Sequence, residues 1–169
     1  RPKLEHRHFE EAANRRAFLD AVAEAHGVRC MRDWRRVARR DVQALRGGAS
    51  LLSRFPGGLW EALQDAYPER IAAERVHAFE ACAQLPAAYW ARPAHVAAFL
   101  RHAAAVLRLR APEDWLRVPL ADLRALGGAG LLRRMPLAAA LRQAFPDQRW
   151  PPPAARPAKK RAAQHRLYR

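Results

Sequence analysis

One sequence pattern occurs twice in this chain of 169 residues, and this repetition constrains the fold more than any other feature. Each copy contains an Asp-Trp pair, a second Asp, a Gly-Gly pair, a Leu-Leu pair and a closing aromatic residue before proline. The matching core-type residues are Phe18, Trp34, Leu51, Leu52 and Tyr67 in the first copy and Phe99, Trp115, Leu131, Leu132 and Phe145 in the second. Repetition of apolar positions predicts a duplicated scaffold with these residues as structural core.

Two aspartates repeat with the apolar residues, as the pairs Asp33/Asp114 and Asp41/Asp122. Each stands just before an apolar helical stretch, where a carboxylate caps free amides and complements the helix dipole. The arginines differ between the copies. We therefore interpret the aspartates as helix caps, and the repeat as a shared scaffold without a shared catalytic centre.

The composition predicts an all-α fold, because threonine is absent and no stretch alternates β-branched with polar residues. We expect a first long helix from about Phe9 or Glu11 to Gly27, and its counterpart from about Pro93 through Leu107. Residues 69–85 are expected to form one connecting helix. The predicted organisation is an N-terminal arm (1–8), a first helical repeat (9–68), a connecting helix and hinge (69–92), a second helical repeat (93–150) and a basic, Pro-containing tail (151–169).

The charge of the chain favours a polyanionic partner. It has 31 Lys and Arg against 16 Asp and Glu, a formal net charge of +15. GC-rich coding would explain the preference for Arg over Lys, but it does not explain the shortage of acids. An anionic membrane is disfavoured, because no apolar stretch has the length of a membrane span and no free amphipathic helix stands out.

Candidate RNA-binding residues form three groups. They are Arg32, Arg35, Arg36, Arg39 and Arg40 around the first Trp; Arg54, Arg133 and Arg134 after the Leu-Leu pairs; and Arg156, Lys159, Lys160, Arg161, Arg166 and Arg169 in the tail. If residues 34–40 are helical, Arg35/Arg39 and Arg36/Arg40 are each one turn apart and repel unless phosphates lie between them. The alternative for the first group is a solvated face.

Some aromatic residues lack a counterpart in the other copy: Trp60, Tyr89, Trp90 and Trp150. We expect these four to be the better candidates for base stacking or partner contacts. The Gly-Gly pairs would let backbone amides approach a phosphate, but a tight turn between helices is the preferred interpretation. They lack the strand context of a nucleotide-binding loop.

The sequence shows no catalytic or metal-binding pattern. Cys30 and Cys82 are far apart and unmatched, so we expect no disulfide framework. The histidines form no ligand grouping, although His6 and His8 are a weak metal-like pair. The only serines, Ser50 and Ser53, flank a Leu-Leu pair. We therefore expect no enzyme activity, no cofactor or metal and no small-molecule substrate.

The motif resembles a repeated α-helical module of algal and other eukaryotic proteins. It is carried by residues 33–37, 41–42, 47–52 and 62–68, and again by 114–118, 122–123, 127–132 and 140–146. That module often closes with a Trp after the Tyr-Pro, which Trp150 matches in the second copy only. The resemblance implies a scaffold and supplies no catalytic residues.

These observations predict a structural RNA-binding protein, a lineage-specific accessory protein of an organellar ribosome that contacts rRNA phosphates and neighbouring ribosomal proteins. The expected location is the mitochondrion, with the chloroplast as the alternative. The chain begins at Arg1, which is compatible with an upstream transit peptide. The competing interpretations are a protein-binding structural subunit of another large organellar complex and a DNA-binding module.

Overall fold

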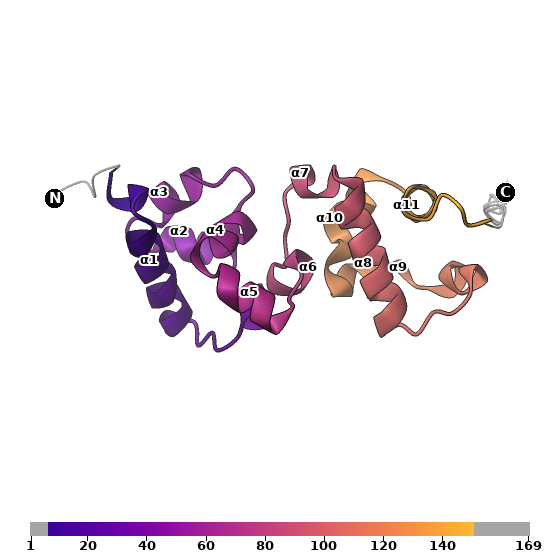
Figure 1. Cartoon of the computed structure of the whole chain (residues 1–169), viewed down its shortest axis with the longest axis horizontal. Coiled ribbons are helices and arrows are strands. Elements are labelled where there is room, and N and C mark those ends of the chain that lie inside the picture. The colour runs from indigo at the N-terminus through magenta and orange to yellow at the C-terminus, as the bar shows by residue number, and fades with distance from the viewer. Residues whose placement is uncertain (1–6, 151–169) are drawn as a thin grey trace, which may run out of the picture.

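The computed structural model describes residues 7–150, and every regular element in that range is helical (Figure 1). The all-α prediction is therefore confirmed. The first half (residues 7–76) contains η1 His8–Glu10, α1 Ala12–Ala25, η2 Met31–Arg36, α2 Arg39–Ala44, α3 Gly48–Ser53, α4 Leu59–Ala66 and α5 Pro68–Glu74. Helix α6 Ala78–Ala81 follows. The second half (residues 87–150) contains α7 Ala87–Trp90, α8 Pro93–Val106, η3 Pro112–Arg117, α9 Leu120–Leu123, η4 Arg124–Gly128, α10 Ala129–Arg134 and α11 Leu137–Ala144.

The two long helices, α1 and α8, end in the same way. After α1, Gly27 has a φ of 65° and the Val28 N–H donates to the Ala23 carbonyl oxygen at 2.9 Å. After α8, Arg108 has a φ of 56° and the Leu109 N–H donates to the Ala104 carbonyl oxygen at 2.9 Å. This bond across a left-handed residue satisfies a free carbonyl at a helix end. Among residues 7–150, no helix is long and apolar enough to cross a bilayer.

Aspartates of the repeated pattern cap short helices from inside the first turn. Asp33 Oδ2 accepts the N–H groups of Arg29 and Cys30 at 2.9 and 3.2 Å, and Asp114 Oδ2 accepts those of Arg110 and Ala111 at 2.8 and 2.9 Å. These backbone donors hold the pKa of both carboxyls below the usual value. Asp41 likewise accepts the Ala38 N–H at 2.8 Å.

Asp122 has no matching bond because the residue before α9 is Pro119, which has no N–H to donate.

Each half has its own apolar core. In the first half Trp34, Leu51, Leu52 and Tyr67 are buried, and Phe18 packs against them half-buried. In the second half Phe99, Trp115 and Leu131 are buried, while Leu132 and Phe145 pack against this cluster half-buried. The long helix of each half packs against the helix that ends the repeated pattern, α1 against α4 and α8 against α11. All ten predicted core residues therefore lie in or against one of two clusters.

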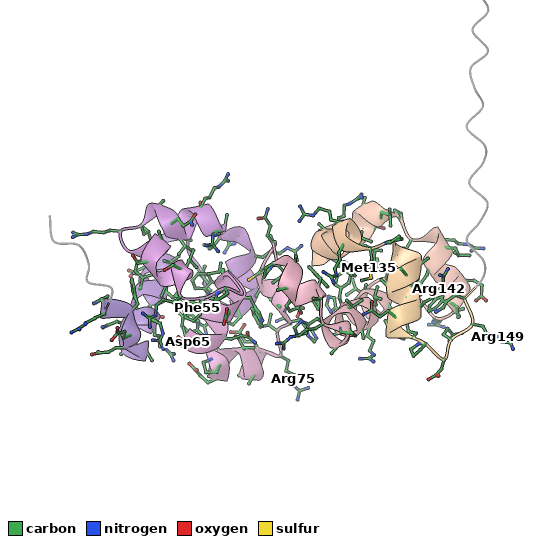
Figure 2. All side chains as sticks on the ribbon, turned by 90° about the horizontal axis from the view of Figure 1, so that it is seen from above. Phe55, Asp65, Arg75, Met135, Arg142 and Arg149 are labelled. Atoms are coloured by element: carbon green, nitrogen blue, oxygen red, sulfur yellow. The ribbon has the colours of Figure 1, made fainter. Side chains whose placement is uncertain are left out.

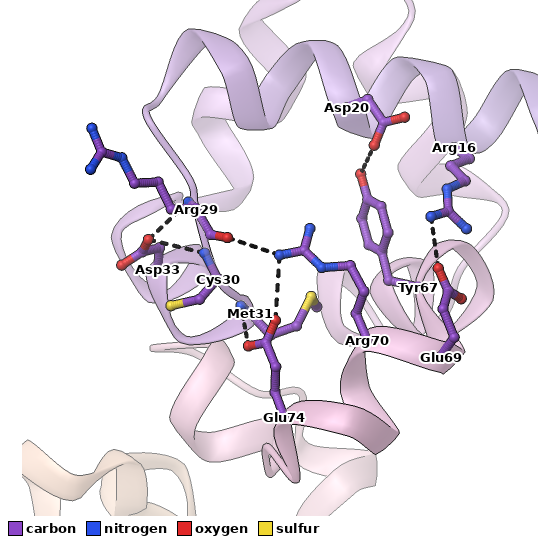
Figure 3. Close-up of polar contacts among 10 residues, drawn as sticks. All are labelled: Arg16, Asp20, Arg29, Cys30, Met31, Asp33, Tyr67, Glu69, Arg70 and Glu74. Atoms are coloured by element: carbon purple, nitrogen blue, oxygen red, sulfur yellow. Dashed lines mark hydrogen bonds and ion pairs between the residues drawn. The ribbon is translucent and has the colours of Figure 1, made fainter.

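Polar contacts fasten α5 to the rest of the first half (Figure 3). The Tyr67 hydroxyl donates to Asp20 Oδ1 at 2.6 Å, and Arg16 pairs with Glu69 at 2.7 Å. Burial and the neighbouring Asp20 raise the pKa of Tyr67 well above its ordinary value, so the phenol stays protonated and keeps donating. Glu74 Oε2 accepts the Met31 N–H at 2.7 Å. These contacts tie α5 to α1 and η2.

The connecting segment differs from the single helix expected over residues 69–85. Helix α5 ends at Arg75, which has a left-handed φ of 49°, and the Val76 N–H donates to the Ile71 carbonyl oxygen at 3.3 Å. A new helix, α6, then begins with the His77 N–H donating to Glu80 Oε2 at 2.8 Å. The break buries Val76. The caps at the end of α5 and at the start of α6 therefore favour two short helices over one continuous helix.

Helix α6 joins the halves, which lie side by side along the long axis of the molecule (Figure 1). It packs against η2 of the first half and η4 of the second. Ala81 and Cys82 belong to the first core, whereas Phe79 belongs to the second and meets the Phe99 ring edge-on at 5.2 Å. The segment predicted to separate the repeats therefore contributes side chains to both cores.

Candidate nucleic-acid interface

The arginine cluster of the first half does not lie on one continuous helix. Helix η2 ends at Arg36, and extended residues Val37 and Ala38 precede α2. Residues 34–40 therefore do not form the one helix in which Arg35/Arg39 and Arg36/Arg40 would be neighbours one turn apart. The physical reason is the Asp41 carboxylate, which accepts the Ala38 N–H and starts a new helix, while buried Val37 anchors the extended link.

Arg35 connects the two halves of the molecule. Its Nη1 donates to the Phe79 carbonyl oxygen at 2.8 Å, and its Nη2 donates to the Ala125 carbonyl oxygen at 2.6 Å. Phe79 lies in α6 and Ala125 lies in η4. The planar guanidinium with several donors is suited to such a double contact. Arg35, which the sequence predicts as a phosphate ligand, therefore has a structural role at the junction of the two halves.

Other members of the cluster make weak, exposed ion pairs. Arg32 pairs with Glu80 at 3.2 Å, Arg36 with Asp33 at 3.4 Å and Arg40 with Asp41 at 3.9 Å. The side chains of Arg36 and Arg40 are 64% and 88% exposed. Exposed pairs of this kind contribute little to stability. The Arg36 and Arg40 guanidinium groups can therefore exchange their carboxylate partners for phosphates at small cost.

A surface hollow of about 340 Å³ lies beside the cluster. Arg35, Arg36 and Arg39 line it together with apolar side chains that include Leu59 and Leu85. We call it the basic hollow. Its combination of guanidinium groups and an apolar wall is suited to a ligand that is both anionic and flat or apolar.

The predicted basic residues beyond this cluster lie elsewhere. Arg54 follows α3, and Arg133 and Arg134 end α10, all three exposed. The Gly-Gly pairs before them form turns between short helices, with Gly47 and Gly127 at φ values of 94° and 105°. The six predicted residues of the tail lie outside the described range 7–150: Arg156, Lys159, Lys160, Arg161, Arg166 and Arg169. His6 of the predicted metal-like pair also lies outside that range.

The structure corrects one aromatic candidate and places the others. Trp90, expected as a stacking or partner residue, is fully buried in the second core and meets Phe99 edge-on at 5.5 Å. The hinge expected at residues 86–90 instead forms helix α7, which packs on α10 and carries this ring inward. Tyr89 stacks on His95 at 4.0 Å between ring centroids. Trp60 and Trp150 are half-buried against the first and second cores.

Two side chains with chemically reactive groups, Cys82 and His102, lie in apolar surroundings. Burial raises the pKa of the Cys82 thiol to about 12, so the reactive thiolate is not formed at neutral pH. Burial also lowers the pKa of His102, whose ring packs near Phe79 and His77. Within residues 7–150 no three His, Cys, Asp or Glu side chains gather as metal ligands would.

We predict that Arg35→Ala lowers the free energy of unfolding by about 2 kcal/mol, because two carbonyl oxygens lose a charged donor. Urea denaturation followed by far-UV circular dichroism measures this loss. The matched control is Arg36→Ala, which removes an exposed ion pair and a long, exposed hydrogen bond to the Gly27 carbonyl oxygen and should cost less than about 1 kcal/mol. Equal stability of the two variants would contradict the junction role of Arg35.

Comparison with known proteins leaves the function to be inferred from the chain itself. The chain matches no protein-family model, no curated protein and no solved structure.

Proposed function

We propose that the chain is a structural RNA-binding protein that neutralises phosphates of a folded RNA. The observation that carries this proposal is the unbalanced charge. With 31 Lys and Arg against 16 Asp and Glu, a net charge of +15 remains after every acid has a basic partner. Charge of this size and sign is the electrostatic basis of sequence-independent RNA binding.

The basic hollow is the proposed point of contact in the described part of the chain. Arg36 and Arg39 line it with exposed side chains, and Arg35 lines it from the junction of the halves. Arg40 is exposed and follows Arg39 in the sequence. An unpaired base fits against the apolar wall while its flanking phosphates meet the guanidinium groups. Recognition would then depend on RNA shape and charge more than on base identity.

The proposed setting is an organellar ribosome, in the mitochondrion or alternatively the chloroplast, with rRNA as the ligand. A ribosomal accessory protein needs a rigid scaffold and many phosphate contacts but no reacting groups. The scaffold, the basic surface and the inert Cys82 thiol agree with this requirement. A DNA-binding module is the weaker alternative, because no helix within residues 7–150 carries Asn, Gln and Arg together as a reader of base edges.

We predict that reversing Arg36, Arg39 and Arg40 to Glu weakens binding to a hairpin-containing RNA at least roughly tenfold and lowers the slope of log K against log salt. Arg35 is retained because it holds the halves together. The matched control reverses three exposed arginines far from the hollow in sequence, Arg75, Arg92 and Arg101, for the same change in charge. Equal losses in both variants would show a response to net charge alone and would refute the proposed site.

The cellular setting is tested by sedimenting the native protein from an extract with and without ribonuclease. Co-migration with a ribosomal subunit that ribonuclease abolishes supports the rRNA proposal. Migration with a large complex that ribonuclease leaves intact would assign the chain to a protein assembly, the second interpretation.

A further inference from the structure

The link between α6 and α7, residues 82–86, forms one wall of the basic hollow. It runs between the two halves of the molecule (Figure 1). All five of its residues line the hollow: Cys82, Ala83, Gln84, Leu85 and Pro86. Successive side chains of a non-helical segment point to different sides, so five consecutive lining residues place the main chain itself in the wall. A ligand in the hollow therefore meets backbone groups as well as side chains.

Most backbone N–H groups of the link have no acceptor in the described part of the chain. The Cys82 N–H donates to a carbonyl oxygen of α6 at 2.8 Å, and Pro86 has no N–H. The N–H groups of Ala83, Gln84 and Leu85 donate to no described atom. Ala83 and Gln84 are also exposed. Because a backbone N–H requires an acceptor, these two groups, which we call the link amides, are available to a ligand.

The charges around the link favour an anion. Arg35, Arg36 and Arg39 line the same hollow, and none of the described residues that line it is Asp or Glu. Two carbonyl oxygens hold Arg35, whereas Arg36 and Arg39 are exposed. Backbone amides and guanidinium groups are donors that proteins use for phosphate. Arg142 and Arg149, near the far end of the second half (Figure 2), line no part of the hollow.

We propose that the α6–α7 link is a phosphate-binding loop, whose amides bind one phosphodiester of the RNA together with the guanidinium groups of Arg36 and Arg39. The hollow, with a volume of about 340 Å³, lies at the small end of the range for ligand pockets, roughly 300 to 1,000 Å³, and fits a single nucleotide. The base of that nucleotide lies against Leu59 and Leu85. This inference rests on the proposed function, to which it adds the main-chain groups that hold the ligand.

Ala83→Pro removes one link amide and leaves the charge of the chain unchanged. Cys82 has φ −125° and ψ 123°, the extended geometry that a residue before proline requires, so the link accommodates this substitution. Fluorescence anisotropy with a hairpin RNA that has an unpaired loop should show roughly tenfold weaker binding, because a hydrogen bond to a charged group is lost. The slope of log K against log salt should stay the same, since no cationic group is removed.

Ala12→Pro is the matched control for this variant. It makes the same substitution at the first position of α1, where the preceding residue Glu11 is extended and proline is tolerated. Because Ala12 does not line the hollow, RNA binding should be unchanged. A second pair separates the amide of Gln84 from its side chain: Gln84→Pro should weaken binding more than Gln84→Ala. Circular dichroism checks that all four variants are folded.

A double-mutant cycle tests whether the Ala83 amide and the Arg39 guanidinium bind the same phosphate. In an Arg39→Ala background, Ala83→Pro should weaken binding by less than in the wild-type background, because the phosphate that both groups share is already held less firmly. In an Arg142→Ala background the full loss should remain, since Arg142 lies outside the hollow.

Two results would overturn the phosphate-binding loop and leave the proposed function in place. One is RNA binding of wild-type strength by both Ala83→Pro and Gln84→Pro. The other is strict additivity of Ala83→Pro and Arg39→Ala, which would show that the amide and the guanidinium do not share a phosphate. A wild-type chain that fails to bind the hairpin RNA would instead refute the proposed function, and this inference with it.

Discussion

Trp34→Ala is expected to lower the free energy of unfolding by about 3 to 5 kcal/mol, the range typical of a large aromatic side chain removed from a core. The Trp34 ring is fully buried and lies 6.2 Å from the Tyr67 ring, measured between centroids. Tyr67 in turn donates to Asp20. Truncation therefore opens a cavity beneath the contacts that fasten α5, and the first half should lose its cooperative transition first.

Urea denaturation followed by circular dichroism, with amide exchange resolved by residue, measures this effect and separates the halves. Trp115→Ala is the matched variant in the second half and should act there. Trp60→Ala is the control, since its half-buried ring should cost less. A Trp34→Ala protein that keeps its stability but loses RNA binding would show that the ring serves the ligand and not the core.

Gly48→Ala is expected to destabilise the first half by about 3 kcal/mol or more, because overpacking forces the backbone to shift. A Cβ atom at Gly48 would lie 1.8 Å from the Val42 carbonyl oxygen. Because that oxygen belongs to the backbone of α2, it cannot move aside unless the helix shifts. The second half repeats the constraint. A Cβ at Gly128 would lie 2.5 Å from Cζ of the Phe99 ring and 2.9 Å from the Leu123 carbonyl oxygen.

Thermal denaturation compares Gly48→Ala with Gly27→Ala. Gly27 has a left-handed φ of 65° but no atom within 4 Å of its would-be Cβ. Its substitution therefore reports backbone strain alone, roughly 1 kcal/mol. A loss no greater at Gly48 than at Gly27 would contradict the close approach of α2 and α3.

Much of the local architecture could be predicted from the sequence, because it depends on contacts within a few residues. The Asp33 and Asp114 carboxylates cap helices three residues from the N–H groups of Cys30 and Ala111. The Gly-Gly pairs predicted tight turns. In each pair the first glycine has a left-handed φ and the second leaves no room for a Cβ atom. The repeated apolar residues predicted two cores. Periodicity and capping residues carry such information directly.

The candidate site was less predictable, because its residues act over long sequence separations. A string of arginines around Trp34 predicted one phosphate-binding face, whereas Arg35 instead binds carbonyl oxygens 44 and 90 residues away. The break at Val37 places the arginines on two helices, η2 and α2, although Arg35, Arg36 and Arg39 still line one hollow. Trp90, unmatched in the repeat, was expected at the surface, yet α7 folds it into the second core.

The sequence alone thus determined the helical class, the two sets of core residues, the capping aspartates and the large positive charge, because each follows from local spacing or composition. Only the tertiary structure decided that α6 contributes to both cores, that Arg35 joins the halves, and that Arg36 and Arg39 line one hollow although they lie on different helices. Those features depend on which surfaces meet. Burial and hydrogen-bond satisfaction between distant segments decide that, and neither is encoded in a local pattern.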